Sequence, residues 1–409
     1  MKDLRALNKY FWKYRYRFIL GIIFVVLSNI FGVITPKVIR YAIDLLTNNL
    51  QLNGILGTVD GQSSNFKSVS KILLIFSGVY LGLYLAKGLF TFFMRQTIIY
   101  MSRLIEFDLK NEIYAQYQLL SQAFYKRNNT GDLMNRATED VSRVRMYLGP
   151  AVMYTINLIA LFTLVIYSMF QVNATLSLYV LLPLPVLSVS IYYISSLINK
   201  KSEEIQRQLS RLTSIAQESF SGIRVIKSFI QERPMMQFFD SESRKYRTTS
   251  LEFARIQAFF FPSMMLLIGL STILTIYIGG LQVFNGSITP GNIVEFVIYV
   301  NMLTWPVMSL GWVASLVQRA AASQKRINEF LHVKPDIVSS DADPVEIDGK
   351  IEFKDVSFTY PDTGIKAIRN LNLKLNKGKR LAIVGKTGSG KSTIAQLLLR
   401  AYDAVSYTH

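Results

Sequence analysis

The chain has 409 residues, of which 50% are hydrophobic and 18% are charged, and its mean hydropathy is +0.27. Soluble domains usually carry about 25% charged residues, so this composition argues against an ordinary soluble protein. The absence of cysteine excludes a disulfide scaffold, a thiolate metal site and a cysteine nucleophile, and having only two histidines, His332 and His409, excludes a histidine-rich metal site. The formal net charge of +18 fits a nucleic-acid partner, an anionic membrane surface or charge sorting across a bilayer, and the positions of the charges decide among these.

Long uncharged stretches predict six membrane-spanning helices arranged as three hairpins. Residues 146–199 contain no charged side chain and are far longer than one crossing of about 20 residues, so they are predicted to form two spans around the polar turn 171–173. Residues 256–318, with Glu295 as their only charge, divide in the same way. The polar stretch 47–70 is predicted to be a loop between the first two spans. The six predicted spans are 18–34, extending past Pro36, then 72–94, 148–170, 174–198, 259–281 and 293–317.

The distribution of lysine and arginine predicts the orientation of these spans. The first 17 residues hold six basic side chains against one acid, Asp3, whereas the turns of the second and third hairpins carry no charge. Basic residues remain on the cytoplasmic side, so both termini and the basic segments 103–145 and 200–255 are predicted to be cytoplasmic, with the loop 47–70 external. The first apolar stretch lacks a small-residue cleavage site, so we expect no cleavable signal peptide. Because the charges flank the membrane, we expect no nucleic-acid partner.

The two cytoplasmic segments, 103–145 and 200–255, are predicted to be helical arms that continue from the spans. Apolar residues recur in them at three- and four-residue spacing, beginning at Ile105 in the first arm. An extension of about 20 helical residues reaches about 30 Å below the membrane. Polar interruptions at 128–132 and 219–222 allow each arm to turn back. A simple helical connector is the alternative that periodicity alone leaves open.

Beyond residue 331 the composition indicates a linker and then a soluble α/β segment. Prolines, serines and aspartates gather in the linker, and runs of strand-like residues follow it. The predicted elements are a linker at 332–349, strands at 351–358, 368–375 and 381–384, and a helix at 394–399.

A phosphate-binding loop follows the last predicted strand. It fits the pattern G-x-x-x-x-G-K-[ST] and stands between a strand and a helix, which is the context that this loop requires. Glycines let backbone N–H groups converge on phosphates, Lys391 is expected to reach the β- and γ-phosphates, and Ser392 is expected to ligate Mg²⁺. A chance glycine-rich turn is the alternative. The predicted nucleotide-binding residues are Gly385, Lys386, Thr387, Gly388, Ser389, Gly390, Lys391, Ser392 and Thr393.

Tyr360 is a second candidate for nucleotide binding. It precedes Pro361 at the end of the first predicted strand. An aromatic side chain in such a place can stack on a nucleobase, although packing against the strand is the simpler interpretation of the residue taken alone.

Together these features resemble an ATP-binding cassette (ABC) exporter of the half-transporter type, similar to multidrug and lipid exporters. The resemblance is specific and covers nearly the whole chain. Besides the phosphate loop, it is carried by residues 356–361 (VSFTYP), Trp305 and Pro306 with Gly311 and Trp312, Gln318 to Ala320 with Ala322, Ser323, Arg326 and Ile327, residues 221–229 (SGIRVIKSF) and residues 397–400 (LLLR).

The resemblance implies a mainly α fold, in which a six-span helical membrane domain precedes the first α/β part of a P-loop nucleotide-binding domain. It implies ATP with Mg²⁺ as the cofactor, Tyr360 as the adenine-stacking residue, and a second half-transporter subunit, identical or different, as the partner in the bilayer. The arm tips near 124–132 and 213–222 resemble the coupling helices that rest on nucleotide-binding domains and transmit their closure to the spans. The implied division is a cytoplasmic segment 1–17, a membrane domain 18–331, a linker 332–349 and a partial nucleotide-binding domain 350–409.

The segment after the phosphate loop departs from the family pattern. The 409 residues contain no glutamine loop, signature motif, Walker B acid, catalytic glutamate or switch histidine, and residues 404–409 do not resemble the family's continuation. We therefore expect a truncated chain that has no catalytic residues and no ATPase activity of its own.

We expect its intact parent to be an ATP-hydrolysing exporter that moves an amphipathic solute, such as a drug, lipid or peptide, outward across a bacterial-type inner membrane. A nonhydrolytic membrane channel or regulator gated by nucleotide is the alternative. A membrane-tethered phosphoryl transferase is disfavoured, because six spans would serve no purpose in it.

Charged residues inside the spans are the candidates for contact with the transported solute. They are costly in a bilayer and are commonly functional, which singles out Lys87, Arg95 and Glu295. Each has a simpler interpretation: Lys87 snorkels toward the headgroups, Arg95 lies near the cytoplasmic surface, and Glu295 lies near the outer turn.

Overall fold

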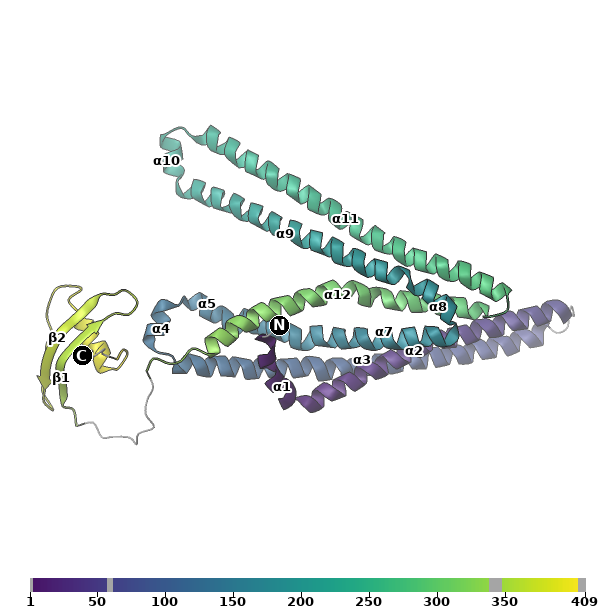
Figure 1. Ribbon diagram of the computed structural model, residues 1–409, viewed down its shortest axis with the longest axis horizontal. Coiled ribbons are helices and arrows are strands. Elements are labelled where there is room, and N and C mark those ends of the chain that lie inside the picture. The colour runs from purple at the N-terminus through teal and green to yellow at the C-terminus, as the bar shows by residue number, and fades with distance from the viewer. Residues whose placement is uncertain (1–2, 57–61, 338–347, 404–409) are drawn as a thin grey trace. The chain divides into compact units, whose positions relative to one another are not determined.

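The computed structural model describes residues 3–56, 62–337 and 348–403 (Figure 1). They are almost entirely helical up to residue 331 and form a two-stranded sheet with one helix beyond it, which confirms the predicted fold class. The chain divides into two compact units, each described by itself: the first holds Met1–Arg15, Ile99–Pro150 and Leu316–His409, and the second holds the rest. The predicted domain boundaries at residues 17, 331 and 349 stay a prediction.

The first half of the chain is built from two long helices followed by a series of short ones. The short helices form the tip of the first arm and lead back through two π-helical turns, the second of which contains Pro150, a residue that cannot donate a backbone hydrogen bond. The elements are a 3-10 helix Asp3–Leu7, α1 Asn8–Lys13, α2 Arg15–Leu56, α3 Gln62–Leu119, α4 Gln122–Arg127, α5 Thr130–Asn135, the π-helical turns Arg136–Asp140 and Tyr147–Ala151, α6 Val141–Met146 and α7 Val152–Val172.

The predicted loop at 47–70 is wrong for most of its length. Helix α2 continues to Leu56 and α3 begins at Gln62, while residues 57–61 lie outside the described residues. Serine and asparagine cost only about 0.5–0.7 kcal/mol each in a helix relative to alanine, and even glycine costs only about 1 kcal/mol. A helix that is already nucleated can therefore extend through such a polar stretch.

The second half consists of α8 Ala174–Leu181, α9 Pro183–Ser221, α10 Ile223–Ser228, α11 Glu232–Phe284 and α12 Pro290–Leu331. Their ends agree with the predicted turns at 171–173 and after residue 284, and with the predicted interruption at 219–222. Residues 338–347, which make up most of the predicted linker, lie outside the described residues.

Five helical stretches of the described residues are long and apolar enough to cross a membrane, and they contain five of the six predicted spans. The remaining predicted span, 174–198, is also helical but is divided between α8 and α9. Leu182, between the two helices, keeps helical dihedral angles (φ −57°, ψ −38°), so the division is a kink at Pro183 and not a turn.

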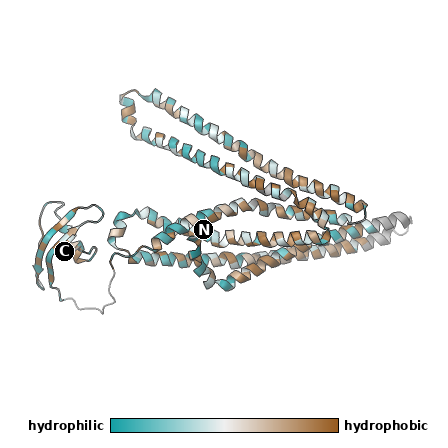
Figure 2. Ribbon diagram, in the orientation of Figure 1, coloured by the Kyte–Doolittle hydropathy of each residue, from teal (hydrophilic) through white to brown (hydrophobic). Residues whose placement is uncertain are grey.

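The second arm is an antiparallel pair formed by α9 and α11, which pack along each other and are joined through α10 (Figure 1). A buried carboxylate helps to hold the pair, because Glu242 of α11 lies 2.8 Å from Arg211 of α9 and 2.7 Å from Lys245. Hydropathy changes along the same helices: residues near α10 are mostly hydrophilic, and residues toward α8 and the far end of α11 are hydrophobic (Figure 2). Each helix thus combines a membrane span with a polar extension, as the predicted arms require.

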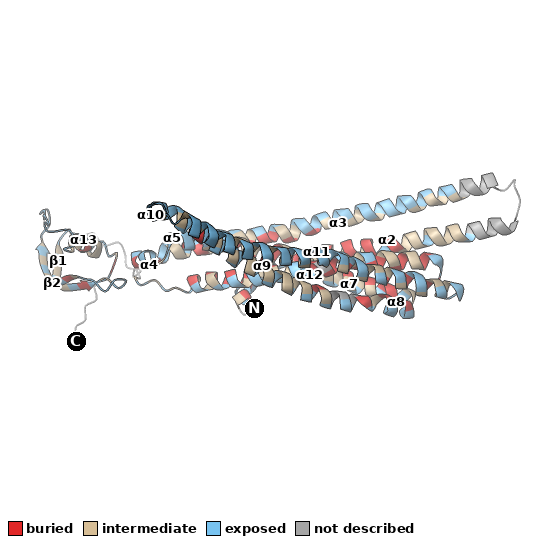
Figure 3. Ribbon diagram, turned by 90° about the horizontal axis from the view of Figure 1, so that it is seen from above, coloured by how far each residue is buried: buried red, intermediate tan, exposed pale blue. Residues whose placement is uncertain are grey.

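Burial distinguishes the inner faces of the helices from those left for lipid or a partner. In the second unit a core formed by α2, α7, α8, α11 and α12 includes Phe296, Tyr299 and Val165, which are fully buried. Helices α3, α9 and α11 expose large apolar side chains, including Leu74 and Tyr192 (Figure 3). Exposed apolar surface of this extent is typical of helices that face lipid or another subunit.

The α/β segment contains two antiparallel strands, β1 Ile351–Thr359 and β2 Lys366–Leu375, and the helix α13 Lys391–Leu398. The strands pair with Ile351 opposite Leu375 and Phe358 opposite Ile368. The predicted strand at 381–384 is wrong for this structure, where the segment is extended and exposed. A strand requires a neighbour for its backbone hydrogen bonds, and the sheet of the described residues consists only of β1 and β2.

Candidate functional site

The loop between residue 384 and α13 has a backbone that only glycine accommodates at two positions. Gly388 and Gly390 have φ values of +85° and +86°, in the left-handed region that side chains disfavour. A Cβ atom on Gly390 would collide with the carbonyl oxygen of Ala367 in β2, and one on Gly385 would lie 2.9 Å from the Ser389 hydroxyl. The sequence GKTGSGKST therefore forms a tight concave turn, which is the shape that the phosphate-loop pattern predicts.

Lys391 holds this turn together from inside. Its Nζ donates hydrogen bonds to the carbonyl oxygens of Gly385 and Lys386 at 2.8 and 2.7 Å. These acceptors are neutral, so they do not cancel the charge of the ammonium. A positive charge at the start of α13 favours an anion there, and the partial charge of the helix terminus has the same sign.

Tyr360 lies directly beside the phosphate loop. Its hydroxyl donates to Gln396 Oε1 at 3.0 Å and shares a hydrogen bond with the buried Thr393 hydroxyl at 2.9 Å, so two of the predicted site residues are in contact. Its ring packs edge-to-face against Phe358 and Tyr402, with centroids 5.0 and 5.5 Å away. The predicted stacking of Tyr360 on adenine stays a prediction.

The tip of the first arm contacts the α/β segment within the first unit. Ala123 of α4 packs into the small core that contains Phe358, Ile368 and Tyr402. Lys126 of α4 lies over the rings of Tyr360 and Tyr402, with its Nζ 5.2 and 5.1 Å from their centroids. The nearby Tyr402 phenol raises the pKa of Lys126, so its charge is maintained. This cation–π contact could not be predicted from the sequence, because nothing in the local pattern of α4 distinguishes Lys126 from other basic residues.

A cavity of about 360 Å³ lies within the second unit among α2, α3, α7 and α12. Lys87 and Arg95 of α3 line it, together with polar residues of α2 and aromatic residues of α7 and α12. Two of the three charged candidates for solute contact are thus brought to one cavity. A lysine at the centre of a span costs about 2.5–3.5 kcal/mol in membrane insertion, so its retention at a cavity wall calls for a function.

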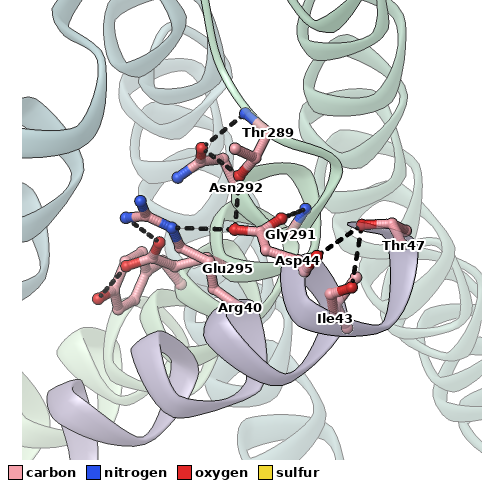
Figure 4. A network of polar contacts seen from close by, with 9 residues as sticks. Arg40, Ile43, Asp44, Thr47, Thr289, Gly291, Asn292 and Glu295 are labelled. Carbon is pink, nitrogen blue, oxygen red and sulfur yellow. Dashed lines mark hydrogen bonds and ion pairs between the residues drawn. The ribbon is translucent and has the colours of Figure 1, made fainter. Parts of the chain in front are cut away.

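Glu295, the third candidate, lies away from this cavity in a polar network that joins α2 to the start of α12 (Figure 4). Its carboxylate is fully buried, accepts a hydrogen bond from Tyr299 at 3.0 Å and pairs with Arg40 of α2 at 3.5 Å. Its contacts support the simpler interpretation that it lies near the outer turn.

Asp44 completes this network on the turn itself. It accepts hydrogen bonds from the Thr289 hydroxyl at 2.8 Å and from the Gly291 N–H at 2.9 Å, and Arg40 lies 3.6 Å away (Figure 4). A Cβ atom on Gly291 would lie 2.6 Å from the Arg40 carbonyl oxygen, so glycine is needed for this approach. Arg40 and Asp44 were missed at the sequence level, although two opposite charges four residues apart at the end of an apolar span are a usable signal.

Comparison with known proteins gives matches along most of the chain. A family model described as the ABC transporter transmembrane region matches residues 18–307, and one described as ABC transporter matches residues 368–407. The probable multidrug resistance ABC transporter ATP-binding/permease protein YheI of Bacillus subtilis (strain 168) is 29% identical over 98% of this chain and 66% of its own length. The multidrug resistance-like ATP-binding protein MdlA of Escherichia coli (strain K12) is 30% identical over the same shares.

A third relative, the ATP-dependent lipid A-core flippase of Syntrophus aciditrophicus (strain SB), is 32% identical over 79% of this chain and 54% of its own length. The chain spans about two thirds of the length of the first two relatives, 66% in each case.

Proposed function

Because the chain belongs to the ABC transporter family, we propose that it is one subunit of an ATP-driven exporter that moves an amphipathic solute outward across a bacterial-type inner membrane. The observation that carries the proposal is the joining, in one chain, of long apolar helices that continue as polar helical extensions to a glycine-rich loop tied by Lys391 through the carbonyl oxygens of Gly385 and Lys386. The proposed division is the cytoplasmic segment 1–17, the membrane domain 18–331, the linker 332–349 and the nucleotide-binding part 350–409.

The residues of the loop fit ATP and Mg²⁺. Gly388 and Gly390 give the loop its left-handed backbone, and a Cβ atom on Gly385 would crowd the Ser389 hydroxyl, so the loop is a glycine-dependent backbone turn whose N–H groups would meet the phosphates. Lys391 would exchange its two carbonyl acceptors for the β- and γ-phosphates, and Ser392 would ligate Mg²⁺. Bound ATP with its metal supplies the free energy of phosphoryl transfer, and the residues of this chain contribute binding, orientation and neutralisation of charge.

The arms are proposed to transmit the state of the nucleotide to the spans. In the first arm, α4 contacts the α/β segment through Ala123 and Lys126, so a shift of that segment would displace α4. In the second arm, the end of α9 exposes Phe220, an apolar side chain suited to a second subunit of the same family. We propose that two subunits, identical or different, work together, and that the chain crosses the membrane several times with both termini cytoplasmic.

We also propose that the 409 residues by themselves bind ATP weakly and do not hydrolyse it steadily. Phosphoryl transfer depends on positioning and on stabilisation of charge by several groups. In these residues the loop, Ser392 and Lys391 supply only part of that set, and no acid that could orient water is among the predicted site residues.

The export function is tested with the intact parent protein in proteoliposomes. The measurement is the accumulation of a fluorescent amphiphile inside the vesicles. ATP is expected to drive accumulation, and Lys391→Ala is expected to abolish it and to weaken binding of a trinitrophenyl-ATP probe at least tenfold, because the charge that meets the phosphates is lost. Lys377→Ala is the matched control, since Lys377 is an exposed lysine of the same segment that pairs with Asp348 at 2.9 Å. Unchanged transport in Lys391→Ala refutes the pump, and transport driven equally by a nonhydrolysable ATP analogue identifies a nucleotide-gated channel instead.

A further inference from the structure

The cavity among α2, α3, α7 and α12 carries positive charge without any negative charge. Lys87 and Arg95 line it, and none of its lining residues is an aspartate or a glutamate. We propose that this cavity binds the anionic headgroup of an amphipathic solute and that Lys87 recognises that headgroup. The statement that this ligand is the transported solute rests on the proposed export function. Binding of the ligand to the cavity does not depend on export.

Lys87 is placed to meet a ligand and has no acid of its own. Its ammonium extends from α3 toward Gly32 of α2, where a Cβ atom would lie 3.3 Å from Nζ, so the glycine provides the space that the lysine occupies. Its ammonium makes a cation–π contact with Tyr84, whose ring centroid lies 5.5 Å from Nζ. Among the described residues, no carboxylate oxygen lies within 4.0 Å of the Lys87 Nζ atom, which is the distance limit for an ion pair. The ammonium therefore lies between Tyr84 of its own helix and Gly32 of the neighbouring helix.

The other polar groups near Lys87 already have partners. The hydroxyls of Ser28 and Thr91 share a hydrogen bond at 2.8 Å, and the Asn29 amide donates to the Asn157 side chain and to the Val25 carbonyl oxygen, both at 2.9 Å. An ammonium has three N–H donors. In the part of the chain that the structure describes, no hydrogen bond from the Lys87 ammonium is found, so its N–H groups are available to a ligand, and an anion is the ligand that suits them best.

A second positive charge continues the same wall. Thr91 and Arg95 follow Lys87 at intervals of four residues, so all three lie on one face of α3. Arg95 is exposed and lies about 12 Å further along the helix axis. It is suited to attract an anion toward the cavity, while Lys87 is suited to hold it.

The wall formed by α7 and α12 is mostly apolar and aromatic, with Asn157 and Asn301 as its polar members. Tyr154 of α7 packs against Trp305 of α12 with ring centroids 5.5 Å apart, and Met153, Leu161 and Met302 extend this surface. A cavity of about 360 Å³ is within the range of small-molecule sites, which bury an apolar body and orient it by a few polar groups. The two walls together fit a solute with one anionic end and one apolar end, and they disfavour a cationic one.

The test measures binding to the purified chain in phosphatidylcholine nanodiscs without nucleotide. Three dansyl probes share one alkyl chain and end in a sulfonate, a neutral amide or a trimethylammonium group. With Trp12 and Trp312 replaced by Phe in every variant, energy transfer from the remaining Trp305 to dansyl reports binding near the cavity. The sulfonate is expected to bind at least tenfold more tightly than the amide, and the trimethylammonium probe more weakly than both. Lys87→Met is expected to lower sulfonate affinity about tenfold and to change amide affinity less than about twofold, while Lys87→Arg retains sulfonate binding.

Lys71→Met is the matched control, because Lys71 lies on the same helix, is exposed and does not line the cavity. Equal binding of sulfonate and amide by the unmodified chain overturns the proposal. An equal loss of both probes in Lys87→Met, or the same loss in Lys71→Met, overturns it as well. If the protein binds the sulfonate probe selectively but transports nothing, the proposed export function is refuted and the anion site stands. If ATP drives transport of the sulfonate and amide probes at equal rates, the anion preference is refuted and the export function stands.

Discussion

At the scale of single residues, backbone conformation restricts the phosphate loop more tightly than side-chain chemistry does. Gly390 has a left-handed φ of +86° and also approaches the Ala367 carbonyl oxygen too closely to accept a Cβ atom. Gly364 has a comparable φ of +68° but has open space around its Cβ position. The two glycines therefore share conformational strain and differ in steric collision.

This difference leads to a prediction for nucleotide binding. Gly390→Ala is expected to weaken trinitrophenyl-ATP binding at least tenfold, since the loop must move away from β2. Gly364→Ala places a side chain on a left-handed backbone, which costs about 1–2 kcal/mol of stability. This variant is expected to bind trinitrophenyl-ATP within about twofold of the unmodified chain. Equal binding losses in titrations of the two variants would contradict the steric argument.

A second residue-scale feature is the contact between α1 and α3 in the first unit. Glu112 of α3 accepts hydrogen bonds from Lys9 at 2.6 Å and from the Tyr10 hydroxyl at 2.5 Å. Burial acts to raise the pKa of Glu112, but these hydrogen bonds outweigh it and hold that pKa below its usual value of 4.5. Burial and the same carboxylate raise the pKa of Tyr10. The contact therefore depends on an ionised Glu112.

The sign of this shift predicts a loss of α1 docking in acid. A carboxylate whose folded pKa is lowered contributes stability above its unfolded pKa and loses that contribution as the pH falls through the folded value, here below 4.5. Because the pair is partly exposed, we expect a contribution of about 1 kcal/mol or less. Amide hydrogen exchange in Asn8–Lys13, corrected for the intrinsic rate, is expected to be faster at pH 4 than at pH 7.

Glu112→Gln is expected to show the fast exchange of Asn8–Lys13 already at pH 7, whereas Glu218→Gln, a change at an exposed acid of α9, is expected to leave it slow. Protection that is the same at both pH values in the unmodified chain would exclude Glu112 as the titrating group.

At the scale of elements, the network around Glu295 ties the start of α12 to α2. Glu295 is completely buried, and Arg40 is its cationic partner, with its own side chain 25% exposed. Removing one member of a buried ion pair leaves an uncompensated charge, which typically costs about 3–5 kcal/mol. The network therefore stabilises the junction of α11, α12 and α2 only while both charges are present.

We predict that Arg40→Met lowers the thermal stability of the detergent-solubilised protein strongly and that adding Glu295→Gln restores most of it. Fluorescence-detected size exclusion after heating measures the fraction that remains folded. Arg103→Met is the control: the Arg103 side chain is 60% exposed, and its partner Glu106 keeps Lys110 and Arg145, so the loss is expected to be no more than about 1 kcal/mol. If the Arg40 and Arg103 variants lose stability equally, the buried pair has no special role.

At the scale of the whole molecule, the chain combines apolar helices with charged helical extensions, which we propose to be cytoplasmic. Large apolar side chains are exposed on α3, α9 and α11, as expected for a protein surrounded by lipid and by a second subunit. The same sequence carries a soluble α/β segment. The membrane therefore imposes an orientation that determines which parts of the chain can meet ATP.

This orientation predicts a labelling pattern. The chain contains no cysteine, so Ser64→Cys and Ser221→Cys each introduce a single thiol. In intact cells an impermeant maleimide is expected to label position 64, on the external side, and not position 221, at the end of α9. Permeabilised cells serve as the control and should label both. Labelling of position 221 alone in intact cells would reverse the topology.

Features that depend on local pattern were accessible from the sequence. The spans follow from uncharged stretches longer than a bilayer crossing, the arms from helical periodicity, and the phosphate loop from a spacing of glycines that only one backbone shape satisfies. The structure confirms these helices and the strands at 351–358 and 368–375, whereas the role of Tyr360 stays a prediction.

Features that depend on a distant partner were decided only by the tertiary structure. Residues 381–384 have a strand-like composition, but a strand needs a neighbouring backbone. Residues 47–56 and 62–70 have the composition of a loop, yet they continue helices nucleated in the spans. Lys87 and Glu295 are both charged residues within apolar segments, and only their packing in the structure shows that their surroundings differ. A neighbouring arginine and tyrosine satisfy Glu295, whereas Lys87 faces a cavity that contains no acid. The cost of a buried charge is set by what lies next to it, and that is a property of the fold and not of the local sequence.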